Sequence, residues 1–365
     1  MRDVFEELEY LTGIPAPSGH EDRIISDVKE RIGALADETC IDRLGNLSAT
    51  FGGREKDTAG LLVFAHVDEI GLIVRFIEKD GYLRFERVGG VPEKTLRGQV
   101  VDVHCVDGEG WVTGTIGTVS HHLTPPSAKM VVPETCDMYI DTGLSTEELR
   151  AAGIDVGSMV TYHPNFRRAA PHRIVSKALD NRTGVYLLLH LAEHLFSHRP
   201  RVPTHLVFSV QEEFNVRGLL PVFERLRPTA AICLDITPAS DTPDLRGISA
   251  IALGNGPAVM HMNFHGRGTL GGLLPNPKLR RMIEETARSA GIPFQREVVL
   301  GVITDDSFSQ LTGDWGVAMA HLSIPIRYTH SPIETADVRD IEGAVSLLEE
   351  VVSTFGSDID LSRGC

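Results

Sequence analysis

Two apolar runs of this chain stop abruptly at side chains that can bind metal ions or move protons. They are Leu62-Val63-Phe64-Ala65-His66-Val67-Asp68-Glu69 and Leu206-Val207-Phe208-Ser209-Val210-Gln211-Glu212-Glu213. Runs that are apolar on both faces are typical of buried strands in a parallel sheet, and the sites of such folds lie at the carboxyl ends of the strands. We therefore predict that both runs are buried strands whose ends contribute to one active site.

Three further residues have the right chemistry to join this site: Asp180, Asp235 and His330. Two histidines, two aspartates and a glutamate are ligands that suit a pair of divalent metal ions. Taken singly, each has a simpler explanation, since Asp180 or Asn181 can cap a helix and paired glutamates can form a solvated turn. Five such residues at strand ends or adjacent turns of one chain are much harder to reach by accident, and together they predict a metal-dependent hydrolase.

The residues at the ends of the two apolar runs suggest how metal binding and proton transfer are divided among them. His66 and Asp68 point to the same side of an extended strand, so Asp68 can accept a hydrogen bond from the ring nitrogen that faces away from a metal ion. Glu212 and Glu213 repel one another, and without cations at least one of the two carboxyls should have a raised pKa. A dinuclear hydrolase needs one acid as a ligand and another as general base, and this pair can supply both.

The sequence pattern changes along the chain in a way that predicts two domains. Between about Gly71 and Asn165, short alternating segments are separated by glycines, as in a small β barrel or sandwich. Elsewhere helical and strand patterns alternate, which predicts an α/β catalytic domain of residues 1–69 and 168–365, interrupted by an inserted β domain of residues 70–167. The expected strands are Glu38–Ile41, Leu47–Phe51, Thr204–Val210 and Ala230–Asp235, and the expected helices include Thr183–Phe196, Arg217–Arg225 and Lys278–Ala290.

Bulk composition narrows the class of protein. The 365 residues are 42 % hydrophobic and carry a net charge of −15, which argues against a nucleic-acid surface because phosphate binding needs clustered lysine and arginine. Five scattered cysteines without a Cys-x-x-Cys pair suggest neither a disulfide framework nor a thiolate zinc site. No apolar run approaches the roughly 20 residues of a membrane span, and the amino terminus is not a signal peptide, so we expect a cytoplasmic protein.

The order and wording of the motifs resemble the glutamyl and deblocking aminopeptidases, dinuclear metallopeptidases that assemble as tetrahedral dodecamers. The resemblance covers nearly the whole chain and, as a set, the motifs are highly specific. They are His66-Val67-Asp68-Glu69-Ile70-Gly71, Ala178-Leu179-Asp180-Asn181-Arg182, Gln211-Glu212-Glu213, Leu234-Asp235-Ile236-Thr237 and Thr329-His330-Ser331-Pro332-Ile333-Glu334.

This resemblance implies a fold and a role for each site residue. The fold would be a three-layer α/β/α metallopeptidase domain with an inserted small β barrel that serves as the dimerisation module. One metal ion would be held by His66, Asp180 and Asp235, and the other by Asp180, Glu213 and His330, with Asp180 bridging. Glu212 would be the general base for a metal-bridged water, Asp68 would orient His66, and the ions would be zinc or cobalt, with manganese as a third candidate. A cis peptide would follow Asp180, and the substrates would be peptides with a free amino end.

Some alternatives stay open at this level. A related dinuclear deacylase or carboxypeptidase uses a similar ligand set, and a catalytically inactive scaffold could retain the fold. The chain departs from the family pattern at Asn215, where a glycine is usual; asparagine tolerates left-handed backbone, so we expect retained geometry. Asp305 is a secondary candidate for the pocket. His121, His122, His261 and His265 are predicted to be loop histidines rather than a third metal site.

Overall fold

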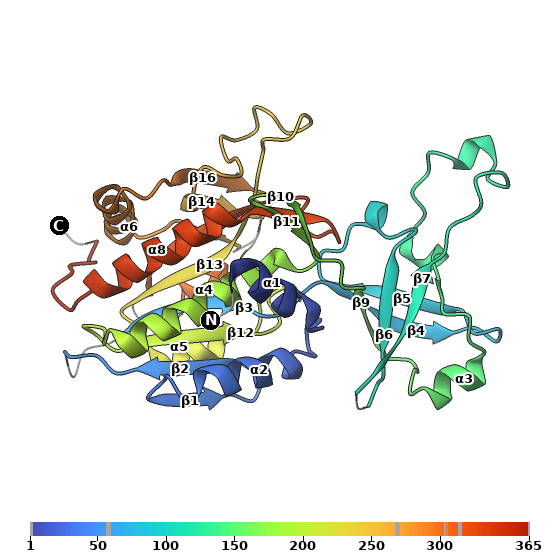
Figure 1. Ribbon diagram of the computed structural model, residues 1–365, viewed down its shortest axis with the longest axis horizontal. Coiled ribbons are helices and arrows are strands. Elements are labelled where there is room, and N and C mark those ends of the chain that lie inside the picture. The colour runs from blue at the N-terminus through green and yellow to red at the C-terminus, as the bar shows by residue number, and fades with distance from the viewer. Residues whose placement is uncertain are drawn as a thin grey trace.

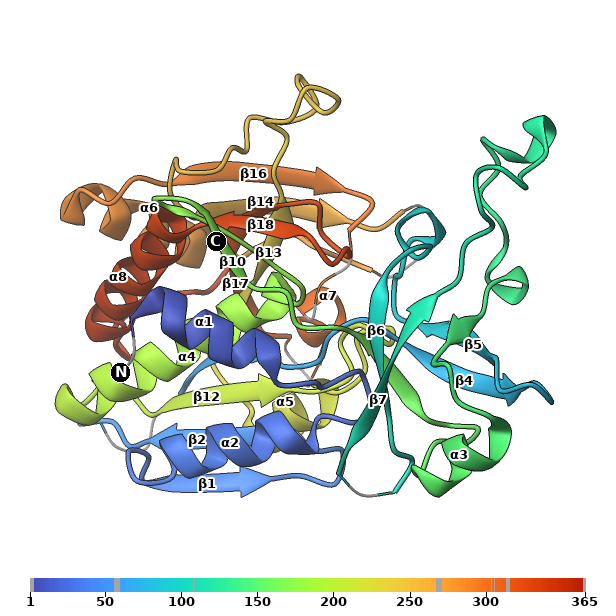
Figure 2. The same cartoon turned by 45° about the vertical axis from the view of Figure 1, so that its right-hand side comes forward.

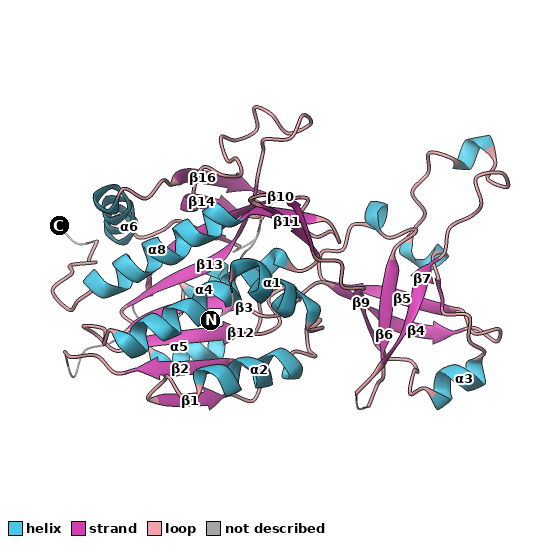
Figure 3. Ribbon diagram, in the orientation of Figure 1, coloured by secondary structure: helices cyan, strands magenta, loops and turns pink. Residues whose placement is uncertain are grey.

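The protein consists of a large α/β unit and a small closed β barrel, seen side by side in the computed structural model (Figure 1). The structure describes residues 3–55, 60–107, 109–266, 271–302, 304, 306–312 and 316–363. The long helices gather on the α/β unit, whereas the barrel consists mainly of strands and loops with a few short helices (Figure 3). The predicted fold class, α/β with an inserted small barrel, is confirmed.

The α/β unit is organised around one mixed sheet, which has 12 strands within the described residues. Its main path runs β1-β2-β12-β3-β13-β17-β18-β11-β10, and β14, β15 and β16 extend from β17. The four central strands β12, β3, β13 and β17 are parallel, so their carboxyl ends meet at one edge. The strands are β1 (Glu38–Ile41), β2 (Leu47–Phe51), β3 (Leu61–His66), β10 (Arg167–Ala170), β11 (Arg173–Ser176), β12 (Thr204–Ser209), β13 (Ala230–Pro238), β14 (Ala258–Phe264), β15 (Gly272–Leu273), β16 (Gln295–Leu300), β17 (Ala318–Arg327) and β18 (Glu334–Asp337).

Helices cover both faces of this sheet and make three layers. Every residue of β3 is buried, and alternate side chains belong to different cores. Leu61 and Val63 pack in the core under α1, α2, α4, α6 and α8, whereas Leu62 and Phe64 pack in the core under α5. Burying each such side chain contributes about 1.5–3 kcal/mol, which is why a run that is apolar on both faces specifies a central strand. The helices are α1 (Val4–Gly13), α2 (Asp22–Ile32), α4 (Leu179–Ser197), α5 (Leu220–Leu226), α6 (Pro277–Ala290), α7 (Asp306–Ser309) and α8 (Val338–Thr354).

Some of the expected elements of this unit match the structure closely at their ends, whereas α4 begins four residues before the predicted helix, α5 begins three residues after it, and β13 ends three residues after the predicted strand. β1 and β2 have the predicted bounds, and α6 begins one residue before the predicted helix. Local chemistry explains the match: the Asn276 side chain caps the amides of Lys278 and Leu279 at the start of α6, and Gly291 ends the helix in a left-handed conformation (φ 67°). Within the described residues, no helix combines the length and the apolar character needed to cross a membrane.

The barrel closes in the order β4-β5-β8-β7-β6-β9 around its own apolar core. Its strands are β4 (Gly71–Ile77), β5 (Leu83–Val88), β6 (Val100–His104), β7 (Trp111–Ile116), β8 (Ile140–Asp141) and β9 (Met159–Tyr162). It also contains helix α3 (Thr146–Ala151) and the short 3-10 helices η1 (Glu93–Thr95), η2 (Pro126–Ala128) and η3 (Thr135–Asp137). We propose that the insertion spans residues 70–167; its last residue is the first of β10, which pairs in the large sheet.

Candidate metal centre and active site

Six of the seven predicted site residues line one cavity of about 620 Å³. The cavity lies at the edge where the parallel strands end. β3 ends at His66, with β12 and β13 as its neighbours, and β17 leads to the turn that carries the last ligand candidate. The six residues are His66, Asp180, Glu212, Glu213, Asp235 and His330, and the seventh, Asp68, is fully buried behind them.

Asp180 lies at the centre of the cluster and turns a different oxygen to each histidine. Its Oδ1 is 3.2 Å from Nε2 of His66, and its Oδ2 is 3.5 Å from Nε2 of His330. Asp235 Oδ1 lies 3.7 Å from the same nitrogen of His66, and Glu213 Oε1 lies 3.4 Å from that of His330. The structure thus brings together two sets of ligand-type atoms that share one carboxylate.

These two sets form one compact cluster. One ligand atom each from His66, Asp180 and Glu213 lie within 4.8 Å of one another, and this trio takes members from both sets. Asp180 and Asp235 are almost fully buried, at 6 % and 4 % exposure. Buried carboxylates at such distances need positive charge between them.

The shifts in the pKa values of these residues also indicate that the cluster needs positive charge. Burial lowers the pKa of His66, but contacts with Asp180 and Asp235 outweigh it and raise that pKa well above its ordinary value. The charge of Glu213 raises the pKa of His330 well above its ordinary value. Burial raises the pKa of Glu213 to about 8, with His330 opposing the rise and Asp180 adding to it, as expected for one member of the adjacent acid pair. Divalent cations between these groups would supply the charge that the imidazoles otherwise supply as protons.

Both imidazoles are oriented as metal ligands should be. Nδ1 of His66 lies 3.1 Å from the backbone carbonyl of Asp68, and Nδ1 of His330 lies 3.0 Å from the carbonyl of Gly90. A ring that donates its Nδ1 proton to a carbonyl has a free Nε2 lone pair, and in both rings Nε2 faces the carboxylates. The donor set therefore fits divalent cations such as zinc or cobalt.

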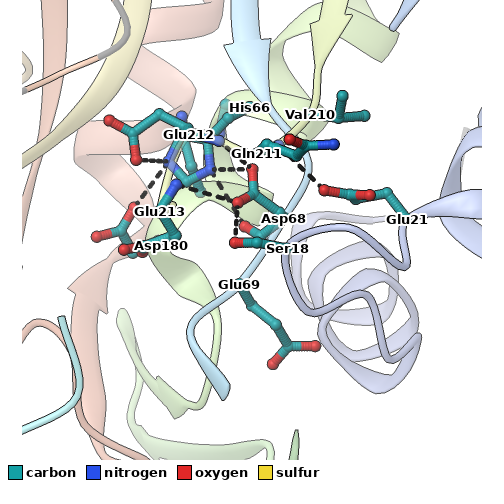
Figure 4. A network of polar contacts seen from close by, with 12 residues as sticks. Ser18, Glu21, His66, Asp68, Glu69, Asp180, Val210, Gln211, Glu212 and Glu213 are labelled. Carbon is teal, nitrogen blue, oxygen red and sulfur yellow. Dashed lines mark hydrogen bonds and ion pairs between the residues drawn. The ribbon is translucent and has the colours of Figure 1, made fainter. Parts of the chain in front are cut away.

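The Asp68 carboxylate has more partners than the sequence predicted. Its Oδ1 lies 3.4 Å from Nδ1 of His66, farther than the backbone carbonyl of the same residue. In addition, the two oxygens accept the backbone amides of Glu212 and Glu213, each at 3.0 Å, and the hydroxyl of Ser18 at 2.6 Å. Figure 4 shows this carboxylate between the histidine and the glutamate turn. Asp68 thus connects the ends of β3 and β12.

The irregular first turn of α4 resolves the choice between helix cap and site residue. The side chain of Asn181 accepts the amide of Gly184, so the asparagine caps the helix and leaves Asp180 for the cavity. Asp180 and Asn181 have non-helical backbone angles, and the peptide bond between them is cis, as the resemblance implies.

Sequence reasoning missed Glu334, which ties two ligand candidates together. This buried glutamate accepts the amide of Asp180 with Oε2 at 3.0 Å and the amide of His330 with Oε1 at 2.9 Å. The motif Ser331-Pro332-Ile333-Glu334 contains the residue. The signal that could have found it was an acid four residues after the ligand candidate His330, within the same motif.

A buried ion cluster behind the site was also not predicted from the sequence. Lys177 Nζ lies 2.6 Å from Oε2 of Glu69, and Arg182 NH2 lies 3.5 Å from Oε1. Arg182 also donates to the carbonyls of Leu11 and Ile14 in the amino-terminal segment. The two basic residues flank Asp180 in sequence, and their ion pairs anchor the segment that carries it.

The remaining candidates have mixed outcomes. His261 is not a loop residue, because it lies in β14 and its Nε2 is 2.8 Å from Glu284. His265 lines the cavity. Asp305 lies outside the described residues.

Comparisons with known proteins agree with this architecture. The family model described as M42 glutamyl aminopeptidase matches residues 45–347. The Escherichia coli protein SgcX is 42 % identical over 346 residues, which cover 94 % of this chain and 92 % of that protein. The solved structure of an aminopeptidase from the archaeon Desulfurococcus kamchatkensis is 35 % identical, with a TM-score of 0.90 over 99 % of this chain and 98 % of that one. The TET1 peptidase of Pyrococcus horikoshii, which can assemble into a tetrahedron or a large octahedral shell, is 29 % identical, with a TM-score of 0.82 over 96 % of this chain and 99 % of that one.

Proposed function

The chain belongs to the M42 glutamyl aminopeptidase family and is a peptidase of the aminopeptidase class, and from this premise we propose how its site works. It removes residues from the free amino ends of peptides with the help of two divalent metal ions, zinc or cobalt. His66, Asp180 and Asp235 would hold one ion, and Asp180, Glu213 and His330 the other. The observation that carries this proposal is the placement of the two Asp180 oxygens, each against a different histidine.

When bound, the ions would lower the pKa of the attacking water and polarise the scissile carbonyl. The residues of the chain supply the proton transfer and the positioning. The Glu212 carboxylate reaches the same cavity, with Oε2 at 4.0 Å from Nε2 of His66. It would take a proton from the attacking water and return it to the leaving amine, as a general base and then a general acid. Asp68, which accepts the amide of Glu212, holds that side chain at its place.

The lining of the cavity offers little to bind the carboxyl end of a peptide. Its four acidic residues, namely Asp180, Glu212, Glu213 and Asp235, would repel a substrate carboxylate, and the two divalent ions would offset their charge. Among the described lining residues, Arg87 is the arginine that could bind a substrate carboxylate. It is already paired with Glu93 at 2.7 Å and with the Val91 carbonyl. A carboxypeptidase would need such a cation for the substrate carboxylate.

Metal reconstitution and mutation test the proposal together. The metal-free protein, loaded with zinc, cobalt or manganese, should hydrolyse leucyl-, glutamyl- or lysyl-nitroanilide and leave N-acylated peptides intact. Glu212→Gln should keep its bound metal by elemental analysis and lose about 10²–10⁴-fold in kcat. Unchanged turnover in that variant would sink the general-base assignment. Hydrolysis restricted to N-acylated peptides or free carboxyl ends would point to the deacylase or carboxypeptidase alternative.

The barrel carries a surface that suits self-association. A long segment between β7 and β8 rises from the barrel (Figure 2), and it exposes Leu123 (78 %), Met130 (94 %) and Val131 (62 %). Apolar side chains clustered on an exposed segment mark interaction sites. By likeness to the TET1 peptidase, we propose a homo-oligomer of dimers built through the inserted domain, ending in a tetrahedral dodecamer. Light scattering on the full chain should give twelve times the mass of one chain; a monomer in solution would contradict this assembly.

A further inference from the structure

The turn that carries Glu212 is held by side chains from three distant parts of the chain. Four consecutive backbone amides, those of residues 210–213, each donate to a side-chain oxygen. Val210 donates to Asn46 Oδ1 at 3.0 Å, and Gln211 donates to Glu21 Oε1 at 3.0 Å. The next two amides donate to the two oxygens of Asp68, each at 3.0 Å. Consecutive buried amides that point outward need such acceptors, because an unpaired buried N–H is costly.

The backbone of this turn does not hold its shape through local preference. Gln211, Asn215 and Val216 have left-handed backbone angles, with φ of 57°, 67° and 55°. Non-glycine residues, and a β-branched valine above all, rarely adopt this conformation. Such conformations persist only where the surroundings over-determine them. Within the turn, the amides of Val216 and Arg217 donate to the carbonyls of Glu212 and Gln211 at 2.7 and 3.2 Å, so the external acceptors are needed for the amides of residues 210–213.

Glu21 and Asn46 are unlike Asp68 because they lie outside the ligand motifs. Asn46 also donates through Nδ2 to the carbonyl of Gly218 at 2.8 Å. It therefore contacts the backbone both at the start of the turn, at Val210, and after its end, at Gly218. Glu21 is 5 % exposed and lies before α2, where its Oε1 also accepts the amide of Gly19 at 2.8 Å. Figure 4 shows Glu21 reaching the Gln211 backbone from the side opposite the histidine.

The same amino-terminal loop supports the acceptor on the other side of the turn. Ser18 donates its hydroxyl to Asp68, the residue that accepts the Glu212 and Glu213 amides. Burial, with the charge of Asp68 adding to it, raises the pKa of Glu21 to about 7. Glu21 acts through one oxygen, Oε1, which accepts the amides of Gln211 and Gly19, and the carboxamide oxygen of a glutamine can also accept them.

We propose that Glu21, supported by Ser18 and Asn46, is a positioning residue that aligns Glu212 for proton transfer by accepting the Gln211 amide. This inference rests on the proposed role of Glu212 and adds a residue that touches neither substrate nor ligand candidates. The loop before α2, about 190 residues away in sequence, thus fixes the catalytic turn. A misplacement of the base by about 1 Å can cost roughly a hundredfold in rate.

A set of matched variants tests the proposal. Glu21→Ala removes the acceptor, and Glu21→Gln keeps an oxygen in the same place without the charge. Asp340→Ala is the control: Asp340 also accepts two backbone amides, those of Gly254 and Gly256 at 2.7 Å, but it does not line the cavity. Each variant is measured by steady-state kinetics and by hydrogen–deuterium exchange of the peptides that cover residues 208–217.

We expect Glu21→Ala to lower kcat by about 10–100-fold with KM changed less than about threefold, and to speed exchange in residues 211–213. Glu21→Gln should restore most of the kcat and the slow exchange, whereas Asp340→Ala should lose stability with little change in kcat. Unchanged exchange and kcat in Glu21→Ala would overturn the proposal. So would a Glu21→Gln variant as impaired as Glu21→Ala, since the charge rather than the acceptor would then matter.

The exchange measurement needs no activity, so it separates this inference from the proposed function. If Glu212→Gln retained full activity while Glu21→Ala still loosened residues 211–213, the general-base role would fail and the support of the turn would stand. If Glu212→Gln were inactive and Glu21→Ala left exchange and kcat unchanged, the positioning role would fail alone. Should Glu21→Ala not fold, Ser18→Ala carries the same test, with a smaller effect of the same sign expected because one donor to Asp68 is lost.

Discussion

The ligand candidates of this site fall into two groups that are held by different means. In the strand group, His66 and Asp235 belong to β3 and β13, where ladder hydrogen bonds fix the backbone. In the turn group, Glu213 and His330 lie beyond the ends of β12 and β17, on turns that contain left-handed residues such as Gln211 and His330 itself (φ 57° and 60°). Asp180 lies between the two groups and contacts both.

The difference shows where the precision of the site comes from. The strand group inherits its geometry from the sheet, which the buried apolar core stabilises. The turn group depends on single carboxylates that accept backbone amides: Asp68 and Glu21 for the glutamate turn, Glu334 for the histidine turn. Substitution of a supporting residue that does not touch the substrate should therefore lower activity more in the turn group than in the strand group.

Removing Asp180 should have the largest effect, because its carboxylate contacts a histidine of each group. Asp180→Ala should bind fewer metal ions by elemental analysis and lose about a thousandfold or more in kcat/KM, since several kcal/mol of metal-derived stabilisation are lost. Two ions bound per chain in this variant would contradict the bridging role.

Glu334→Gln probes the support of the turn group. Both oxygens of Glu334 accept an amide, and a glutamine can replace only one of them. We expect metal affinity or kcat to fall about 10–100-fold, as for other residues that orient ligands. Asp340→Asn, which makes the corresponding change at a carboxylate outside the cavity, should leave both nearly unchanged. An equal loss in both variants would mean that the effect is general destabilisation.

Metal removal should separate the two groups directly. With a chelator present, hydrogen exchange should rise in residues 210–216 and 328–334, where few ladder bonds hold the backbone, and stay slow in β3 and β13. The comparison between the metal-free and the reconstituted protein provides the reference. A uniform rise across both groups would show that the turns are no weaker than the strands.

The smallest effect is expected at Asn215, where the chain departs from the family pattern. Its left-handed φ of 67° suits glycine as well, so Asn215→Gly should change kcat less than about twofold. Asn215→Val should instead lower the free energy of unfolding by about 1–2 kcal/mol, because valine resists this conformation. A large gain in activity for Asn215→Gly would show that the asparagine distorts the pocket.

Much of the fold followed from local pattern. The buried strands β3 and β12 are continuous apolar runs, and the predicted bounds of β1, β2 and α6 agree with the structure because caps and periodicity are local signals. The inserted barrel was signalled by alternating segments and glycines. The outcome at Asn215 also followed from its own chemistry, but the left-handed Val216 beside it had no signal in the sequence.

The sequence by itself determined which residue types stand at the ends of the central strands. The resemblance assigned these residues to two metal ions and to catalytic roles, and those assignments stay predictions. The tertiary structure decided what each acid faces: the Asp68 carboxylate turned to the Glu212 and Glu213 amides, Glu334 joined two distant backbones, and Glu21 reached the Gln211 amide. These contacts join residues that are 144, 154 and 190 positions apart in the sequence. Periodicity and spacing describe neighbours along the chain, whereas an acceptor for a strained turn is chosen by whichever distant side chain the packed fold brings within hydrogen-bond reach.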